Sequence, residues 1–292
     1  MARFRTRTEP LINKFFHRIE HHLTRELRTR RRGRTIEQRS IRLHSSAGYR
    51  IAATVYTPQG NGPWPAVVLC PGSDHSSVVF TSRQAPITAE EVAQLGCIVL
   101  TYDPAGRGSS WGSEDFGGPE HQDNAAEAIR YLRTLTMVDP TRMGLVGISL
   151  GVASAVGAAK LLAENHEPVS WVLDWEGPCD QRTITANQTR QEPALGHKPT
   201  DRSYWYPREA VRHLDSINCG YVRLQGKPDH AQPEELGHAQ AMLQAAAAAS
   251  LPWFQLNEHP RNENPSSPTW LAGGPLTANR ALLRTIDKLI RS

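Results

Sequence analysis

From about residue 65 to its end, the chain alternates between short apolar runs and longer amphipathic segments. The apolar runs, roughly four to eight residues each, are typical of strands that are buried on both faces of a sheet. The longer segments carry apolar residues at three- and four-residue spacing, which indicates helices. The expected strands lie near 65–72, 97–106, 142–147, 169–178, 219–226 and 253–260, and the expected helices near 87–96, 121–135, 149–165, 233–250 and 278–292.

This alternation predicts an α/β fold with a mainly parallel sheet and helices on both of its faces. The preceding segments 35–45 and 49–58 also resemble strands, and the short Ser46-Ala47-Gly48 sequence separates them. A short polar link that contains glycine predicts a hairpin. We therefore expect an antiparallel hairpin at one edge of the sheet, and a single α/β domain over 35–292.

A polar stretch, residues 177–218, interrupts the alternation between two expected strands. It contains the aromatic run Tyr204-Trp205-Tyr206. An insertion at this point emerges beside the carboxyl ends of the strands, where open α/β sheets bind ligands. The stretch is therefore expected to form a small cap over a ligand site.

The first 34 residues form a basic arm. They hold 11 Arg or Lys against 3 Glu, so the arm carries +8 and the remaining chain −4 of the net +4. Residues 11–28 show a helical apolar stripe made of Leu11, Phe15, Ile19, Leu23 and Leu27. Such a helix can lie on an anionic membrane or contact nucleic acid, but we favour packing on its own body or on the second subunit of a homo-oligomer. No nucleic-acid partner is expected.

Composition and short motifs bear on where the protein is located and on whether it binds a metal or a cofactor. No apolar run approaches the roughly 20 residues that cross a bilayer, and the N-terminus lacks the apolar core of a secretion signal, so we expect a cytoplasmic protein. Cys70, Cys97, Cys179 and Cys219 lack the paired spacing of a zinc site. The segment Gly106-Arg107-Gly108 lacks the lysine of a nucleotide-binding loop. We expect neither a metal nor a cofactor.

One candidate for chemistry is the serine in Gly147-Ile148-Ser149-Leu150-Gly151, between the apolar strand 143–146 and the helix 152–162. A serine in a tight strand-to-helix turn stands clear of its neighbours, and the flanking positions need glycine because side chains there would meet adjacent backbone. The helix N-terminus also favours negative charge nearby. The pattern predicts an exposed nucleophile.

The motif and the strand order resemble the α/β-hydrolase family, including its carboxylesterase, dienelactone-hydrolase and prolyl-oligopeptidase-like members, over residues 35–292. In that family the acid and the histidine follow the serine along the chain. The resemblance implies Asp229, in "LQGKPDHAQPEE", as the acid that orients the histidine. A helix cap is the structural alternative for Asp229.

The same resemblance implies His259, after the last strand, as the general base that takes the serine proton. This chain has Glu258-His259-Pro260 where many relatives have Gly-His, so His230 stays open as an alternative base and His259 as a structural residue. Asp174 and Glu176, at the end of the expected strand 169–178, are reserve candidates for the acid.

The resemblance also implies an oxyanion hole, built from the backbone N–H groups of Leu150 and Ser73. Ser73 lies in the loop "LCPGSDHSS" after the first parallel strand, where a structural turn is the alternative and Asp74 or His75 could change the register. Residues 102–112 resemble the loop that shapes the family's pocket, with Trp111 as a candidate wall.

These residues lead us to expect a serine esterase that cleaves a small-molecule carboxylic ester through an acyl-enzyme on Ser149. A serine exopeptidase or amidase on the same fold is the first alternative, and Glu176 would then hold the substrate's terminal amine. A non-catalytic scaffold that docks through the basic arm is the second. Deletion of residues 1–34 distinguishes the two hypotheses. The scaffold hypothesis predicts loss of the main activity, whereas the enzyme hypothesis predicts that hydrolysis largely survives.

Overall fold

The computed structural model describes residues 33–73, 75–82, 85–185, 197–198, 200–230 and 236–292. The predicted helix of the basic arm lies outside these residues. The described part of the chain contains an eight-stranded sheet in the order β1-β2-β4-β3-β5-β6-β7-β9. Its strands are β1 (Ile36–His44), β2 (Arg50–Pro58), β3 (Trp64–Cys70), β4 (Ile98–Tyr102), β5 (Val138–Ile148), β6 (Trp171–Trp175), β7 (Gly220–Leu224) and β9 (Phe254–Leu256).

The predicted edge hairpin is confirmed. β1 and β2 pair antiparallel over their whole length, from Ile36↔Pro58 to His44↔Arg50, and β2 pairs antiparallel with β4. All the other pairings in this sheet are parallel. The carboxyl ends of β3, β4, β5, β6, β7 and β9 therefore share one edge, and residues just beyond these strands are brought together there.

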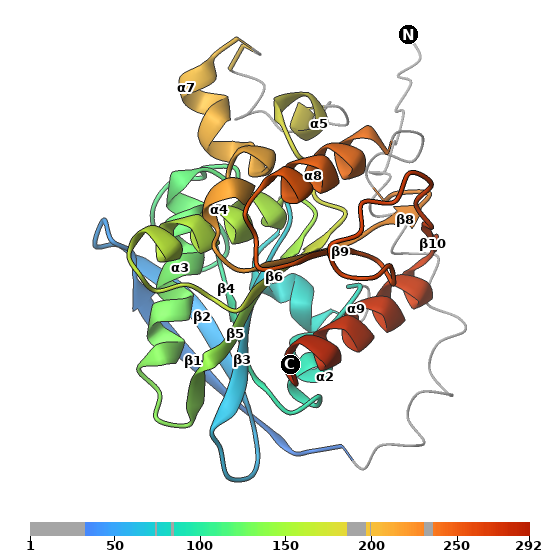
Figure 1. Ribbon diagram of the computed structural model, residues 1–292. Helices are drawn as coiled ribbons and strands as arrows, with labels where there is room; N and C mark the ends of the chain where they lie inside the picture. The colour runs from blue at the N-terminus through green and yellow to red at the C-terminus, as the bar shows by residue number, and fades with distance from the viewer. Residues whose placement is uncertain (1–32, 74, 83–84, 186–196, 199, 231–235) are drawn as a thin grey trace, which may run out of the picture.

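Helices cover both faces of the sheet, as the alternation predicts (Figure 1). One face packs against α3 (Pro119–Arg133), α4 (Gly151–Glu164) and α8 (Gly237–Ala248). The other packs against α2 (Ala89–Ala93) and α9 (Pro275–Leu289). The central strands are buried on both sides, with Val67, Val68, Leu145 and Val146 fully shielded from solvent. Burial of this kind stabilises the fold by roughly 1.5–3 kcal/mol for each large aliphatic side chain.

Short helices occupy the described part of the expected cap. They are α5 (Gln181–Thr185), α7 (Arg202–Trp205) and the 3-10 turns η2 (Tyr206–Arg208), η3 (Ala210–Arg212) and η4 (Leu214–Ser216). Figure 1 shows α5 and α7 at one end of the molecule. Arg208 fastens this segment to the body, because its guanidinium lies 3.7 Å from the Tyr204 ring centroid and binds the Asp115 carboxylate.

A second, two-stranded sheet was not predicted. β8 (Gly226–Lys227) pairs in parallel with β10 (Leu271–Ala272). The last strand of the main sheet is also shorter than expected, because Asn257 turns the chain with a φ of 48°. Its side chain holds this turn through two hydrogen bonds with the backbone of Gln225, of 2.8 and 3.1 Å. The chain after β9 therefore folds back, so that β10 pairs with β8 at residues 226–227.

The four cysteines are buried, and none of them forms a disulfide bond. Burial raises the pKa of the Cys70 thiol to about 12, with a smaller opposing effect of a hydrogen bond to Tyr102. Such a thiol is inert near neutral pH. Within the part of the chain that the structure describes, no helix has both the length and the apolar character that crossing a membrane requires.

Candidate active site

Ser149 lies in a strained turn between β5 and α4. Its φ is 54°, in the left-handed region that residues other than glycine rarely adopt. The turn is held on both sides, because the Ser149 N–H donates to the Trp175 carbonyl and the Ser149 carbonyl accepts from the Val152 N–H, each at 3.0 Å. The hydroxyl has no hydrogen-bond partner among the described residues. This is the geometry that the Gly-x-Ser-x-Gly pattern predicts.

The two flanking glycines are required by close backbone contacts. A Cβ on Gly147 would lie 2.6 Å from the Val152 Cα, and a Cβ on Gly151 would lie 2.3 Å from the Cys70 carbonyl oxygen. Both distances are shorter than a carbon atom tolerates. The second contact also shows that the loop after β3 passes directly beside the serine turn.

The predicted oxyanion donors lie on these two adjacent segments. Gly72 brings them together, because a Cβ there would lie 3.1 Å from the Ile148 carbonyl oxygen and 3.2 Å from the Ser149 Cβ. The backbone N–H groups of Leu150 and Ser73 donate to no acceptor within the described part of the chain. Two free N–H groups beside a nucleophile are what an oxyanion hole needs. Their assignment stays a prediction.

The loop after β4 supports the Ser73 segment. The Arg107 guanidinium donates to the carbonyl oxygen of Gly72 at 2.7 Å and makes two hydrogen bonds to Glu114, at 2.6 and 2.7 Å. Burial raises the pKa of the Glu114 carboxyl, but the hydrogen bonds and charge of Arg107 outweigh it, so the net shift is downward. The Asp103 carboxylate accepts from the Ser77 N–H and hydroxyl. The loop that carries Ser73 is therefore held by the charged side chains of Arg107 and Asp103, both of which are buried.

Trp111, the predicted pocket wall, is 60% exposed. The Arg50 guanidinium lies 5.1 Å from its ring centroid. The residue thus lies at the edge of the sheet where the parallel strands have their carboxyl ends, next to the start of β2.

The loop that carries these anchors also depends on a buried neutral histidine. The Gly117 N–H donates to His121 Nδ1 at 3.1 Å, and His121 Nε2 donates to the Ala105 carbonyl at 3.0 Å. Burial is the main cause that lowers the pKa of His121 to about 4. Protonation would place a second ring N–H against the Gly117 N–H, so the folded protein resists it.

We expect acid to destabilise the protein through His121. The unfolded histidine, with a pKa near 6.5, binds a proton between pH 6.5 and pH 4 while the folded one does not, so stability falls as the pH drops through this window. The loss is about 3 kcal/mol. Urea unfolding at several pH values should show a shallower dependence for His121→Gln. The exposed His44→Gln is the matched control, and an equal slope in both variants would contradict the assignment.

His259 lies beyond the end of β9 and uses its ring locally. Its Nε2 accepts a 2.9 Å hydrogen bond from the Thr269 N–H, and its Nδ1 lies 3.9 Å from Glu263. Among the described residues, no hydrogen bond or ion pair joins His259 to Asp229 or to Ser149. Its role as the general base stays a prediction.

Asp229 is buried and makes other contacts. Its carboxylate accepts from Gln225 Nε2 at 2.8 Å and lies 3.0 Å from His238 Nε2. Its other oxygen is 3.8 Å from His230 Nδ1. The structure therefore places Asp229 beside two histidines, neither of which is His259.

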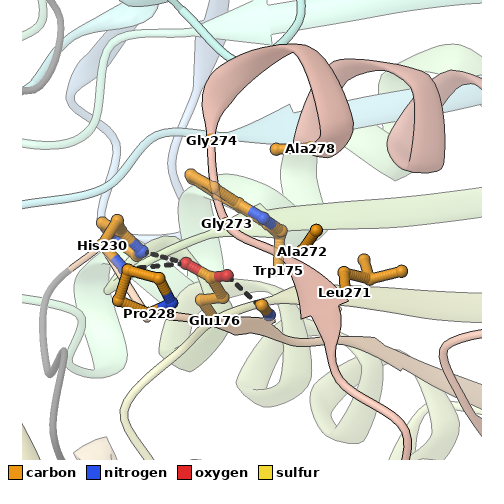
Figure 2. A pocket seen from close by; sticks show the side chains of 10 residues that line it. Trp175, Glu176, Pro228, His230, Leu271, Ala272, Gly273, Gly274 and Ala278 are labelled. Carbon is orange, nitrogen blue, oxygen red and sulfur yellow. Dashed lines mark hydrogen bonds and ion pairs between the residues drawn. The ribbon is translucent and has the colours of Figure 1, made fainter.

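The alternative residues Glu176 and His230 form a close pair (Figure 2). Glu176 Oε2 accepts from His230 Nδ1 at 2.6 Å and from the His230 backbone N–H at 3.0 Å, while Oε1 accepts from the Gly226 N–H at 2.8 Å. Position 226 is glycine because a Cβ there would lie 2.7 Å from Oε1. The imidazole stacks on Trp175, with ring centroids 4.6 Å apart. A small pocket borders the pair, beside residues 271–274.

These side chains also form a candidate cation site within the described residues. One ligand atom each from Glu176, Asp229 and His230 lie within 4.8 Å of one another. Two carboxylates and one imidazole suit a divalent ion. However, the hydrogen bonds within the cluster already satisfy the Nδ1 of His230 and both Glu176 oxygens, so the observed arrangement needs no ion.

Asp174, the other reserve acid, is occupied in the core. Its carboxylate pairs with Arg223 Nη1 at 2.5 Å and accepts from the Tyr221 hydroxyl at 2.5 Å. The side chains of Asp174 and Arg223 are both 0% exposed. A carboxylate held in this way is a structural element of the sheet.

Comparison with known proteins agrees with this architecture. A Pyrococcus furiosus esterase superposes with a TM-score of 0.64 and 13% identity, over 88% of this chain and 92% of that one. The chain has the α/β-hydrolase fold. A puromycin-hydrolysing peptidase of Mycobacterium tuberculosis superposes on this chain with a TM-score of 0.63 and 18% identity, over 87% of this chain and 39% of the peptidase.

Sequence comparison finds likeness over shorter parts of the chain. The family model described as X-Pro dipeptidyl-peptidase (S15 family) matches residues 47–175 of this chain. The thiohydrolase apmlB of Arthrinium phaeospermum is 28% identical over 167 residues, which are 52% of this chain and 50% of the relative. The chain thus spans about half the length of this curated relative.

Proposed function

We propose that this α/β-hydrolase is a serine hydrolase that cleaves carboxylic esters through an acyl-enzyme on Ser149. The observation that carries the proposal is the strained Ser149 turn at a φ of 54°, in close contact with a loop whose Ser73 N–H donates to no acceptor among the described residues. Ser149 attacks the acyl carbon, and the Leu150 and Ser73 N–H groups donate to the oxyanion that forms. A histidine takes the serine proton and returns it to the leaving group, and water then releases the acid.

Thioesters are a second candidate substrate class. The support is the likeness to the thiohydrolase apmlB, which is 28% identical over 52% of this chain. A thioester has the same acyl carbon and a better leaving group, so the same Ser149 and oxyanion donors serve both substrates. Nothing in the proposed machinery has to change.

Peptide cleavage is the alternative that the S15 family model and the mycobacterial peptidase suggest. An exopeptidase needs an acid that holds the substrate's terminal amine. Glu176, the acid considered for that purpose, is buried, and its oxygens accept hydrogen bonds from His230 and Gly226. This occupancy favours esters over peptides.

Fluorophosphonate labelling tests the proposed function. An activated serine attacks the phosphorus and gains a stable adduct, which intact-protein mass measurement detects. We expect one adduct, mapped to Ser149, and faster turnover of p-nitrophenyl esters than of aminoacyl p-nitroanilides. A well-folded protein with no adduct and no ester turnover would reject the serine hydrolase and favour the scaffold alternative. An adduct with turnover of the anilides alone would favour the peptidase.

A further inference from the structure

We propose that His230 is the general base of Ser149 and that Glu176 is the residue that positions it. The inference rests on the proposed serine hydrolase function and names the proton acceptor within it. It departs from the predicted pair of Asp229 and His259, because it takes the carboxylate from the end of β6 and the imidazole from the loop after β7.

The first argument is the tautomer that Glu176 imposes on His230. The carboxylate accepts from Nδ1 at 2.6 Å, so the lone pair of the neutral ring is on Nε2. Two backbone N–H groups, of Gly226 and His230, hold the carboxylate in place. A base whose second nitrogen is held by a fixed acid is the arrangement that activates a serine.

The second argument is the location of the pair beside Ser149. The Ser149 N–H donates to the carbonyl of Trp175, and the His230 imidazole stacks on the ring of the same residue at an interplanar angle of 12°. β5 and β6 are paired in parallel, with Ile148 opposite Trp175. Ser149 and Glu176 are thus the next residues at two adjacent strand ends, and both have a left-handed φ, of 54° and 50°.

The third argument is the contrast with His259. Its Nε2, the nitrogen a base would offer to serine, accepts the Thr269 N–H at 2.9 Å. Its Nδ1 is closest to Glu263, whose side chain is 47% exposed, at 3.9 Å. A loosely paired ring with an occupied Nε2 is less suited to proton transfer than His230. No hydrogen bond joins His230 to Ser149 among the described residues, but such bonds are often long until substrate binds.

The reaction balances with these residues alone. As the Ser149 Oγ–acyl carbon bond forms, the hydroxyl proton moves to His230 Nε2, and the resulting imidazolium donates that proton to the departing alkoxide as the acyl–oxygen bond breaks. Water repeats the sequence, giving one proton to His230 Nε2 and its hydroxide to the acyl carbon. The returning proton restores the Ser149 hydroxyl.

The charges around His230 shift its pKa, so its role as a base can be measured from the pH dependence of activity. Burial lowers the pKa of His230, but the hydrogen bond and charge of Glu176, aided by Asp229 and opposed by Arg223, raise it overall. Since the base acts in its neutral form, activity should rise with pH through the pKa of His230. Glu176→Gln removes the negative charge, so the rising limb of kcat/KM should move to lower pH while kcat falls. A purely structural Glu176 would leave the midpoint unchanged.

Chemical rescue provides the decisive experiment. The His230→Ala variant should lose about 10²- to 10⁴-fold in the rate of fluorophosphonate labelling and of p-nitrophenyl acetate turnover. Added imidazole should restore part of the rate, because it can occupy the vacated space beside Trp175. The exposed His44→Ala is the matched control, and its rate of fluorophosphonate labelling should equal that of the wild type with or without imidazole. His230→Gln provides a second variant of similar volume if His230→Ala fails to fold.

The outcomes separate the two proposals. If Ser149 is labelled normally in folded His230→Ala and His230→Gln, while His259→Ala abolishes labelling, the base assignment is wrong and the serine hydrolase stands. Loss of activity in His230→Ala without any rescue, together with an unchanged pH midpoint in Glu176→Gln, would also reject the assignment. Absence of labelling in the folded wild type would reject both.

Discussion

The Ser149→Ala variant is expected to lose on the order of 10⁴- to 10⁶-fold in kcat toward p-nitrophenyl esters, while it stays folded. Without the hydroxyl no acyl-enzyme forms, and only the oxyanion donors and substrate binding contribute to the residual rate. The Ser149 hydroxyl has no partner among the described residues, so its removal breaks no structural hydrogen bond. Steady-state kinetics, with circular dichroism to verify the fold, measure the effect.

Two further variants sharpen this result. Ser149→Gly should be equally inactive but more stable by about 1 kcal/mol, because glycine tolerates the φ of 54° that strains any other residue here. Ser154→Ala removes a buried hydroxyl from α4, within a few residues of the same turn, and should keep its activity. Retained turnover in folded Ser149→Ala, or an equal loss in Ser154→Ala, would remove Ser149 from the mechanism.

The second large effect concerns stability. Arg223→Met should lower the free energy of unfolding by about 3–5 kcal/mol, because it leaves the Asp174 carboxylate buried without its counter-ion. The lost guanidinium also donates to the Gly177 carbonyl at 3.0 Å and to Gln225 Oε1 at 2.7 Å. Urea unfolding of the variant, compared with the wild type at pH 7, measures this loss.

A matched pair of controls isolates the buried charge. The double variant Asp174→Asn/Arg223→Met should recover part of the stability, since no uncompensated charge then remains in the core. Arg291→Met breaks a pair with Asp287 whose arginine side chain is 64% exposed, and it should change stability by less than about 1 kcal/mol. If Arg223→Met is no more destabilising than Arg291→Met, the buried pair does not hold the sheet together.

Much of the architecture could be predicted because it depends on local pattern. The apolar runs of β3 to β7 are short and bounded by glycine or proline, and the link at 46–48 contains a glycine with a φ of 86°. Both signals lie within a few residues of the structure that they specify. The expected last strand near 253–260 was too long, because the turn at Asn257 depends on hydrogen bonds to Gln225, 32 residues away.

The short strands β8 and β10 show more clearly what a local sequence pattern does not predict. Each has two residues, too few for any hydrophobic period to appear in the sequence. Their pairing nevertheless places residues 271–274 against Pro228 and beside His230. A feature of this size is visible only once the long connection after β9 has folded back.

The turn that carries Ser149 is the part of the candidate site that the sequence by itself determined. A five-residue turn with glycine at both ends predicts a tight strand-to-helix geometry, and the steric requirement at Gly147 comes from Val152 in the same turn, whereas the requirement at Gly151 comes from the Cys70 carbonyl of the neighbouring strand β3. The tertiary structure decided which carboxylate meets which histidine. Asp174 lies opposite Arg223 because β6 and β7 pair in that register, and Glu176 meets His230 because the loop after β7 crosses the end of β6. Register and loop packing depend on contacts about 50 residues apart in the chain, and no local pattern carries that information.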